Sequence, residues 1–500
     1  MSPSRWRRGA HYTGSVALLA GLLVAAGLWI VRTRPYDPAQ HQAPSVVGAA
    51  HDFPVYRDAP LVLSYHDISS ATGSPYTVTP RAFAAQLDTL RKAGFQSIRL
   101  VDVQAMMAGS PVRLPPRPVL LTFDDGLASN WLDADPVLQR YGFTAVAFLV
   151  TATVTEPHRP SSHLSSEQVR RMAASGRWEF GGHTDDLHHL VPVPGGGQAP
   201  ALINRLVGDG EETLAQWEVR VRADLLSSQR FFQDMLGHPV AAFAFPYGAA
   251  DYPSNDPAIP GQLTELLDDA GFQLGFIGED RHRGQERPIT PDTNPYRLPR
   301  ITVTSDLEPA GLLALLHKAA PDPITADLTT LGWSGATARC TVRRDAGRTP
   351  ALRVSSSGYG RCAAQVNAVQ WTDYRLTTGV TGGDRAATAF IGVRVGGTPA
   401  GRDRAEVVLG EAVVRIREQV GEHVEVLAAR RLPPGGDRRV DITVKGDRIT
   451  VHVDRGPPVA ATLAPALAAG AVDFGIAAHG PRTLGYLDPR LVDLRSPPAT

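Results

Sequence analysis

The sequence lacks a net charge of either sign, because 50 lysines and arginines balance 50 aspartates and glutamates. The protein as a whole therefore does not attract polyanions electrostatically, and we expect no nucleic acid among its partners. The sequence also has no repeat of 20 to 50 residues, which argues against a solenoid or a propeller. A chain of 500 residues is too long for one ordinary core, so about two or three domains are expected.

Cysteine is almost absent, and the only two, Cys340 and Cys362, lie close together in the C-terminal part. In an oxidising compartment this pair could close a small loop, and we expect a disulfide. Two unpaired buried thiols are the alternative. A disulfide agrees with export of this part of the chain.

Only one long apolar run is present, at residues 14–31, and it contains no charged residue. Arginines flank this run on both sides, at Arg5, Arg7, Arg8, Arg32 and Arg34. The run is long enough to span a bilayer, and no small-x-small cleavage site is evident after it. The sequence therefore favours an uncleaved signal anchor over a cleaved signal peptide, and both place the rest of the chain outside the cytoplasm.

The N-terminal segments follow from this reading. Residues 1–34 are predicted to form a cytoplasmic tail and transmembrane anchor in the cell membrane. Residues 35–59 are rich in Pro, Ala, His and Gln without periodicity, which is typical of a tether.

Between residues 60 and 321, short apolar runs alternate with helical patterns. Strands are expected at 61–65, 119–123, 145–150, 178–182, 241–245 and 274–277, and helices at 80–94, 134–141, 166–175, 211–236 and 261–270. This alternation predicts an α/β fold, a parallel sheet arranged as a distorted (β/α) barrel. In such folds the chemistry lies at the C-terminal ends of the strands.

Residues 322–500 change to short alternating segments separated by Gly, Pro and Asp, a pattern typical of an all-β sandwich. Lys445 to Arg448 are expected to form a hairpin turn. The region looks similar to laminin-G or concanavalin-like jelly rolls, in which carbohydrate binding is plausible. Trp371 and Tyr374 are expected in the core rather than on a sugar-binding surface, so no binding residue is assigned here.

The strongest chemical signal is Asp124-Asp125-Gly126, directly after an apolar strand. Neighbouring side chains on a strand point to opposite faces, but a turn at Gly126 could bring both carboxylates to one pocket. One would then bind a metal and the other act as a base. Taken alone, this tripeptide is more often a plain turn.

Two histidines, His183 and His188, stand five residues apart after another glycine-rich strand end. Two imidazoles and one carboxylate form a three-ligand metal site that leaves room for water and substrate. His189 could replace His188. The same ligand set also occurs in non-haem iron oxygenases. The presence of two adjacent aspartates and the alternation of strands and helices expected for a barrel argue against that class.

Three segments together resemble the NodB-homology polysaccharide deacetylases, carbohydrate esterase family four, over residues 60–321. They are residues 122–126, 183–188 and 243–248. The five-residue histidine step and residues 65–67 and 298–301 are similar to the poly-β-1,6-N-acetylglucosamine deacetylase branch.

The resemblance implies that Asp125, His183 and His188 hold a divalent metal, with Zn²⁺ expected, and that Asp124 is the base. The backbone N–H of Tyr247 would stabilise the oxyanion. The expected reaction removes N-acetyl groups from an extracellular or cell-wall polysaccharide. Peptidoglycan or another N-acetylated glycan is an alternative substrate, and a non-catalytic glycan-binding surface protein is the alternative function.

The sequence departs from the common family pattern at two positions. His317 follows two leucines but falls in an expected helix at 308–320, so His66 is the preferred general acid, with a structural histidine as the alternative. The usual arginine before the Pro-Tyr motif is missing. Arg300 is expected to stand in for it by pairing with Asp124, unless it is an exposed arginine that binds a substrate hydroxyl.

Overall fold

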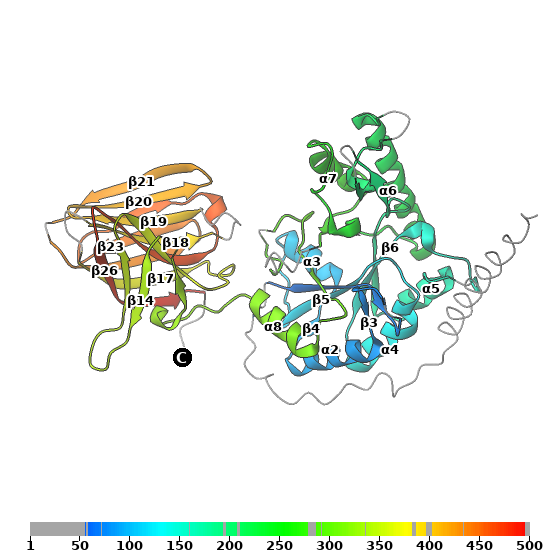
Figure 1. The fold of residues 1–500 in the computed structure, drawn as a ribbon, viewed down its shortest axis with the longest axis horizontal. Helices are drawn as coiled ribbons and strands as arrows, with labels where there is room; N and C mark the ends of the chain where they lie inside the picture. Colours follow the sequence, from blue (N-terminus) through cyan, green and yellow to red (C-terminus); the bar gives the residue numbers. More distant parts are fainter. Residues whose placement is uncertain are drawn as a thin grey trace, which may run out of the picture. The chain divides into compact units, whose positions relative to one another are not determined.

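The computed structural model describes residues 56, 59–71, 73–159, 161–193, 197–207, 211–278, 287–291, 293–335, 337–382, 387–396, 403–433 and 435–495. The chain divides into two compact units, Met1–Ala319 and Ala320–Thr500 (Figure 1). The predicted anchor and tether lie outside the described residues. Among the residues that are described, no helix is both long and apolar enough to cross a membrane.

The first unit is built on a curled sheet in which every paired strand is parallel, in the order β11-β10-β7-β6-β5-β1-β12. Its strands are β1 (Leu61–Tyr65), β5 (Pro118–Phe123), β6 (Ala145–Leu149), β7 (Trp178–Gly182), β10 (Ala242–Ala244), β11 (Leu274–Phe276) and β12 (Ile301–Thr302), with β4 (Gln96–Ser97) beside β5. The two edges approach each other, since Phe276 pairs with Leu298 shortly before β12 begins. The predicted distorted barrel is confirmed.

The central strands explain why this sheet is parallel. β1, β5 and β6 are buried along their whole length. A strand that is covered on both faces reads as a continuous apolar run rather than an alternating one. The charged side chains near these three strands therefore follow the strand ends rather than lie within the strands.

Helices connect the strands and lie around the sheet (Figure 1). They are α2 (Pro80–Lys92), α3 (Leu100–Met107), α4 (Asp135–Tyr141), α5 (Ser166–Ala174), α6 (Leu214–Leu236), α7 (Ile259–Asp269) and α8 (Pro309–Ala319). Sequence analysis missed α3 and began α6 three residues too early. The reason is local, because the Thr213 side chain accepts the N–H of Gln216 and so caps α6.

Two small ribbons complete the unit. They pair β2 (Asp67–Ile68) with β3 (Thr77–Val78), and β8 (Leu190–Pro192) with β9 (Gln198–Pro200). The first ribbon directly follows β1, so it lies at the C-terminal end of the sheet.

The second unit contains two seven-stranded antiparallel sheets, the predicted all-β sandwich. One sheet has the order β13 (Trp333–Ser334), β16 (Tyr359–Ala364), β25 (Ala471–Ala478), β18 (Ala387–Val395), β19 (Arg404–Gly410), β20 (Val413–Val420) and β21 (His423–Arg431). The other has the order β14 (Arg339–Arg343), β15 (Ala351–Ser356), β26 (Arg482–Asp493), β17 (Tyr374–Thr381), β22 (Arg438–Lys445), β23 (Arg448–Val453) and β24 (Val459–Thr462).

Two expectations for this unit are confirmed. Trp371 and Tyr374 are fully buried core residues. Lys445 pairs with Arg448 across the β22–β23 hairpin. The likeness to laminin-G or concanavalin-like domains stays a prediction.

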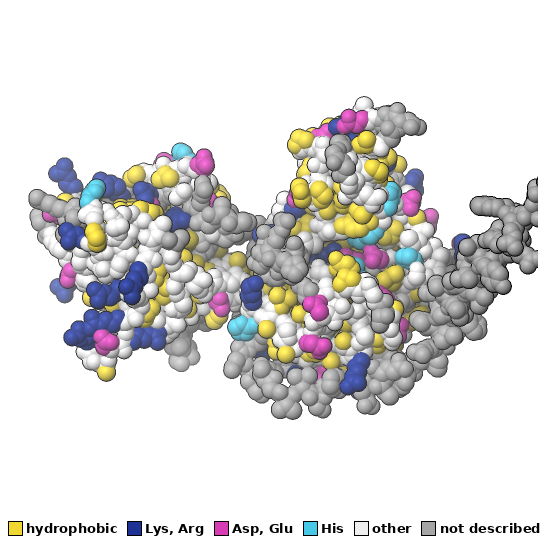
Figure 2. Space-filling model, viewed as in Figure 1, with side chains coloured by type: hydrophobic (Ala, Val, Ile, Leu, Met, Phe, Trp, Pro, Cys, Tyr) yellow, Lys and Arg dark blue, Asp and Glu magenta, His cyan; other side chains and the backbone are white. Residues whose placement is uncertain are grey.

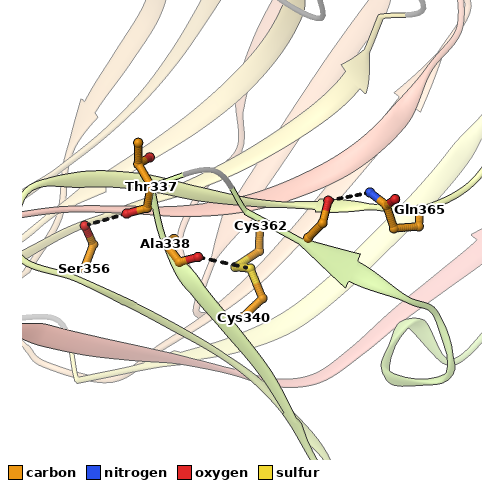
Figure 3. The surroundings of a disulfide bond; sticks show 7 residues. Thr337, Ala338, Cys340, Ser356, Cys362 and Gln365 are labelled. Atoms are coloured by element: carbon orange, nitrogen blue, oxygen red, sulfur yellow. Dashed lines mark hydrogen bonds between the residues drawn. A yellow bond between two sulfur atoms is a disulfide. The ribbon is translucent and has the colours of Figure 1, made fainter. Parts of the chain in front are cut away.

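The predicted disulfide is present between Cys340 on β14 and Cys362 on β16 (Figure 3). These strands belong to different sheets, so the bond links the two layers of the sandwich. Nearby, Ser356 donates a hydrogen bond to the Thr337 carbonyl at 3.2 Å. The disulfide and this hydrogen bond thus hold the edge of the sandwich.

Replacing Cys340 and Cys362 together by Ser is expected to destabilise the second unit by about 3 kcal/mol, because the unfolded chain regains the entropy of an open loop. In calorimetry, the transition of the second unit should fall by roughly 10 °C. The transition of the first unit serves as the internal control and should not move. An unchanged second transition would contradict a stabilising role for this bond.

Candidate active site

Polar side chains from several strands meet at the C-terminal end of the curled sheet. His66 follows β1, Asp124 and Asp125 follow β5, and His183 follows β7. Because the strands are parallel, their C-terminal ends share one edge, where loops can place side chains together. Figure 2 shows acidic and histidine side chains beside each other on the visible face of this unit.

Asp125, His183 and His188 form a potential metal site, with one ligand atom of each within 4.8 Å of the others. The Asp125 Oδ1 lies 3.6 Å from the His183 Nε2 and 3.4 Å from the His188 Nε2. Metal–ligand distances near 2 Å in a tetrahedral zinc site imply ligand separations of about 3.4 Å. The donor set and its spacing therefore fit a zinc-sized cation.

The protonation states of Asp125 and His188 favour this use, whereas a cation would have to displace the proton that a raised pKa favours on His183. Burial raises the pKa of the Asp125 carboxyl, but His183 outweighs burial and the pKa lies below its ordinary value. Burial and the neighbouring His183 lower the pKa of His188 to about 4. Burial also lowers the pKa of His183, but Asp125 and Asp124 outweigh it and the pKa is raised. The carboxylate is thus ionised and the His188 ring is neutral.

The His183 ring is fixed by its surroundings. Its Nδ1 lies 2.7 Å from the Ala244 carbonyl oxygen, to which it donates, so Nε2 is left to face the site. A side chain at Gly181 would lie 2.4 Å from Phe148, so this position of β7 requires glycine. The ligand at the end of β7 is held by tight packing.

Left-handed backbone conformations turn the loops into the site. Asp125 has φ 69° and Thr184 has φ 74°, which residues with a side chain seldom adopt. Sequence analysis placed the turn after the two aspartates, at Gly126, which also has positive φ. The turn starts one residue earlier, at Asp125 itself. Strained conformations of this kind cluster at functional sites.

Arg300 pairs with both oxygens of Asp124. Its two terminal nitrogens donate to Oδ1 at 2.7 Å and to Oδ2 at 2.8 Å. The side chain also donates to the Ile277 carbonyl, and only 2% of Arg300 is exposed. Arg300 is therefore not an exposed arginine, and its pairing with Asp124 is the arrangement that the structure contains.

Asp124 is buried but ionised. Burial by itself raises the pKa of this carboxyl, yet the charges of Arg300 and His183 outweigh burial and hold the pKa below its ordinary value. Fixed hydrogen bonds leave Asp124 in one orientation.

His66 lies beside Asp124, with its Nε2 4.0 Å from the Asp124 Oδ2. The Tyr76 ring packs against the imidazole at 4.9 Å between ring centres, and Asn130 donates to the His66 carbonyl at 2.9 Å. Burial lowers the pKa of His66, while Asp124 opposes that change. Within the described residues, His66 Nδ1 is buried without a hydrogen-bond partner.

Tyr247 belongs to the short helical turn Pro246–Gly248 that follows β10. It has φ 58°, and its ring stacks on His188 at 4.8 Å between centres. Half of Tyr247 is exposed, so its ring lies at the mouth of the site. A side chain at Gly248 would lie 2.5 Å from Gly278, so this close approach requires glycine.

Two histidines considered as candidates in the sequence analysis lie outside the potential metal site. His189 is exposed and its Nδ1 lies 2.9 Å from the Asp186 carbonyl oxygen, so His188 is the histidine that joins His183. His317 is exposed on α8, as expected for a helix-surface residue.

Comparison with known proteins shows which proteins the first unit resembles. Residues 112–259 match the family model described as polysaccharide deacetylase. Over these residues the first unit is similar to polysaccharide deacetylases.

Relatives match about half of the chain. A protein of Staphylococcus epidermidis named poly-β-1,6-N-acetyl-D-glucosamine N-deacetylase is 28% identical over 266 residues, which cover 50% of this chain and 81% of the relative. A protein of the same name from Staphylococcus aureus is 25% identical over 261 residues, covering 49% and 79%. The solved structure of IcaB from Ammonifex degensii has 28% identity and a TM-score of 0.41, covering 52% of this chain and 98% of that one.

Sequence analysis missed one buried carboxylate beside the candidate site. Asp224 on α6 accepts the N–H groups of Asp185, Asp186 and Leu187. The available signal was its position between Val221 and Leu225, on a helix face that is otherwise mostly apolar. A charge at such a position usually has a specific partner.

Proposed function

We propose that this protein is a metal-dependent N-deacetylase of an N-acetylglucosamine polysaccharide, with the β-1,6-linked polymer as the preferred substrate. The observation that carries the proposal is the convergence of Asp125, His183 and His188 beside a buried, ionised Asp124. The names of the staphylococcal relatives support the substrate class.

The three ligands would hold a divalent cation, and two imidazole nitrogens with one carboxylate oxygen favour Zn²⁺. When bound, such a cation lowers the pKa of a water molecule and polarises the acetamide carbonyl.

Asp124 acts as the general base in this proposal. It accepts the proton of the water that adds to the acetamide carbon, and Arg300 keeps it ionised until then. The fork of Arg300 also fixes the direction of the free lone pairs of the carboxylate. The base is therefore oriented before substrate binds.

His66 and Tyr247 complete the set. The Tyr247 backbone N–H donates to the oxyanion, and His66 donates a proton to the nitrogen as the carbon–nitrogen bond breaks. Acetate and a free amine result. The partly buried His66 lies 4.0 Å from Asp124, which supports this assignment because both proton-transfer groups then lie in the same part of the site.

Acetate release by the full chain from β-1,6- and β-1,4-linked N-acetylglucosamine oligomers tests the proposal. Release should be faster from the β-1,6 oligomer, should stop after treatment with a chelator and should return when Zn²⁺ is restored. Release that survives complete removal of metal would overturn the metal dependence. Preference for the β-1,4 oligomer would transfer the assignment to a peptidoglycan-like substrate.

The alternative function is a glycan-binding surface protein without activity. It requires an impaired site, whereas both aspartates and both ligand histidines are present and brought together. Glycan binding by a folded, zinc-loaded protein that releases no acetate would favour this alternative.

We also propose that the protein is exported and anchored in the cell membrane by residues 14–31. The Cys340–Cys362 disulfide supports export, because such bonds persist in oxidising compartments. An extracytoplasmic site would face the polysaccharide substrate directly.

A further inference from the structure

Asp224 organises the loop that carries His188. The loop comprises residues 184–188, which form neither helix nor strand. The Asp224 Oδ1 accepts the N–H of Asp185 at 2.9 Å, and its Oδ2 accepts those of Asp186 at 2.8 Å and Leu187 at 3.1 Å. One carboxylate therefore takes the place of the backbone acceptors that a regular element would provide.

The carbonyl side of the same loop is held by the chain after β6. The N–H of Thr151 donates to the Thr184 carbonyl at 3.1 Å, and the N–H of Ala152 donates to the Asp185 carbonyl at 3.0 Å. The Thr151 hydroxyl also donates to the Asp185 carboxylate at 2.5 Å. The loop is thus clamped on two sides, by backbone contacts on one and by Asp224 on the other.

The two histidine ligands depend on different supports. His183 directly follows β7 and its ring is fixed by the Ala244 carbonyl. His188 instead comes directly after Leu187, the last residue whose N–H Asp224 accepts. A change at Asp224 should therefore shift His188 relative to Asp125 and leave His183 in place.

We propose that Asp224 is a positioning residue of the metal centre: it holds the loop in the conformation that brings the His188 Nε2 within reach of a cation shared with Asp125 and His183. The inference rests on the proposed metal-dependent function. Only 9% of Asp224 is exposed and it accepts three backbone N–H groups at once, so water is a poor replacement.

Asp135 provides a matched control. It is also a buried carboxylate with three side-chain donor contacts, from the Arg177 Nε at 3.0 Å, the Arg177 terminal nitrogen at 2.9 Å and the Trp178 Nε1 at 2.9 Å. Trp178 begins β7, whereas His183 follows its end. Loss of Asp135 contacts should affect stability without moving the ligands.

The test is zinc binding by the full chain, measured in competition with a chromophoric chelator at a temperature where circular dichroism shows each variant folded. Asp224→Asn keeps the shape but replaces one acceptor oxygen with a donor, and should weaken zinc binding by about 10- to 100-fold. Its kcat with saturating zinc should fall while KM changes little. Asp224→Glu keeps the charge and should recover part of the zinc affinity, which provides a second readout if the Asn variant does not fold.

Asp135→Asn should unfold at a lower temperature yet bind zinc like the unmodified protein. Unchanged zinc affinity in both Asp224 variants would overturn the positioning role and leave the proposed function standing. Absence of zinc binding by the unmodified chain would instead overturn the proposed metal dependence, and the positioning role with it.

Discussion

Replacing Asp124 by Asn is expected to lower kcat for acetate release by about 10²- to 10⁴-fold, the usual contribution of a general base. The amide has nearly the same shape but cannot accept the proton of the attacking water. Because Asp124 binds no cation in the proposed site, zinc affinity should stay within a fewfold of that of the unmodified chain. Steady-state kinetics and zinc titration on the same preparation measure both effects.

Asp125→Asn is the matched control for that experiment, since it alters the adjacent carboxylate. It should weaken zinc binding strongly, because the Asp125 oxygen lies 3.4 Å from His188 and 3.6 Å from His183. The two variants thus separate loss of the base from loss of the metal. Near-normal acetate release by Asp124→Asn with zinc bound would exclude Asp124 as the base.

The fold of the first unit could be predicted because its strands are continuous apolar runs. β1, β5, β6 and β7 begin and end within about one residue of the predicted positions. Strands that are buried on both faces appear in the sequence as short apolar runs, and segments with a helical pattern separate these runs. α3 escaped prediction because it spans only eight residues, too few for a helical period to stand out clearly.

The site could be predicted in part, because catalytic side chains follow strand ends. The two aspartates and His183 stand directly after β5 and β7, so the topology alone brings them to one edge. The choice between His188 and His189 depends on the loop conformation, which spacing does not determine. Asp224 contacts this loop from far along the chain, through hydrogen bonds that a linear pattern does not reveal.

Arg300 is a second case in which the sequence pattern suggests a residue but not its contacts. Its sequence position left open whether it pairs with Asp124 or faces a substrate. The difference lies in burial, since only 2% of Arg300 is exposed and its guanidinium donates to both oxygens of Asp124. Burial of a charged pair is a property of the packed sheet, and it sets the protonation state on which the base depends.

Replacing Arg300 by Met is expected to destabilise the first unit by about 3 to 5 kcal/mol, because it leaves the Asp124 carboxylate buried without a partner. Methionine fills much of the arginine volume, so loss of packing contributes little. The pKa of Asp124 should rise, since the charge that offsets burial is gone. Denaturant unfolding measures the first effect, and the acidic limb of the pH–rate profile, which should move to higher pH, measures the second.

The double variant Asp124→Asn with Arg300→Met separates the unpaired charge from other consequences of the substitution. With no carboxylate left to compensate, it should be more stable than Arg300→Met alone, although it lacks the base and stays inactive. Arg300→Lys keeps the charge but loses the two-pronged contact, so its stability should lie between those of Met and Arg. If Arg300→Met unfolds at the same denaturant concentration as the unmodified protein, Arg300 does not compensate the buried charge of Asp124.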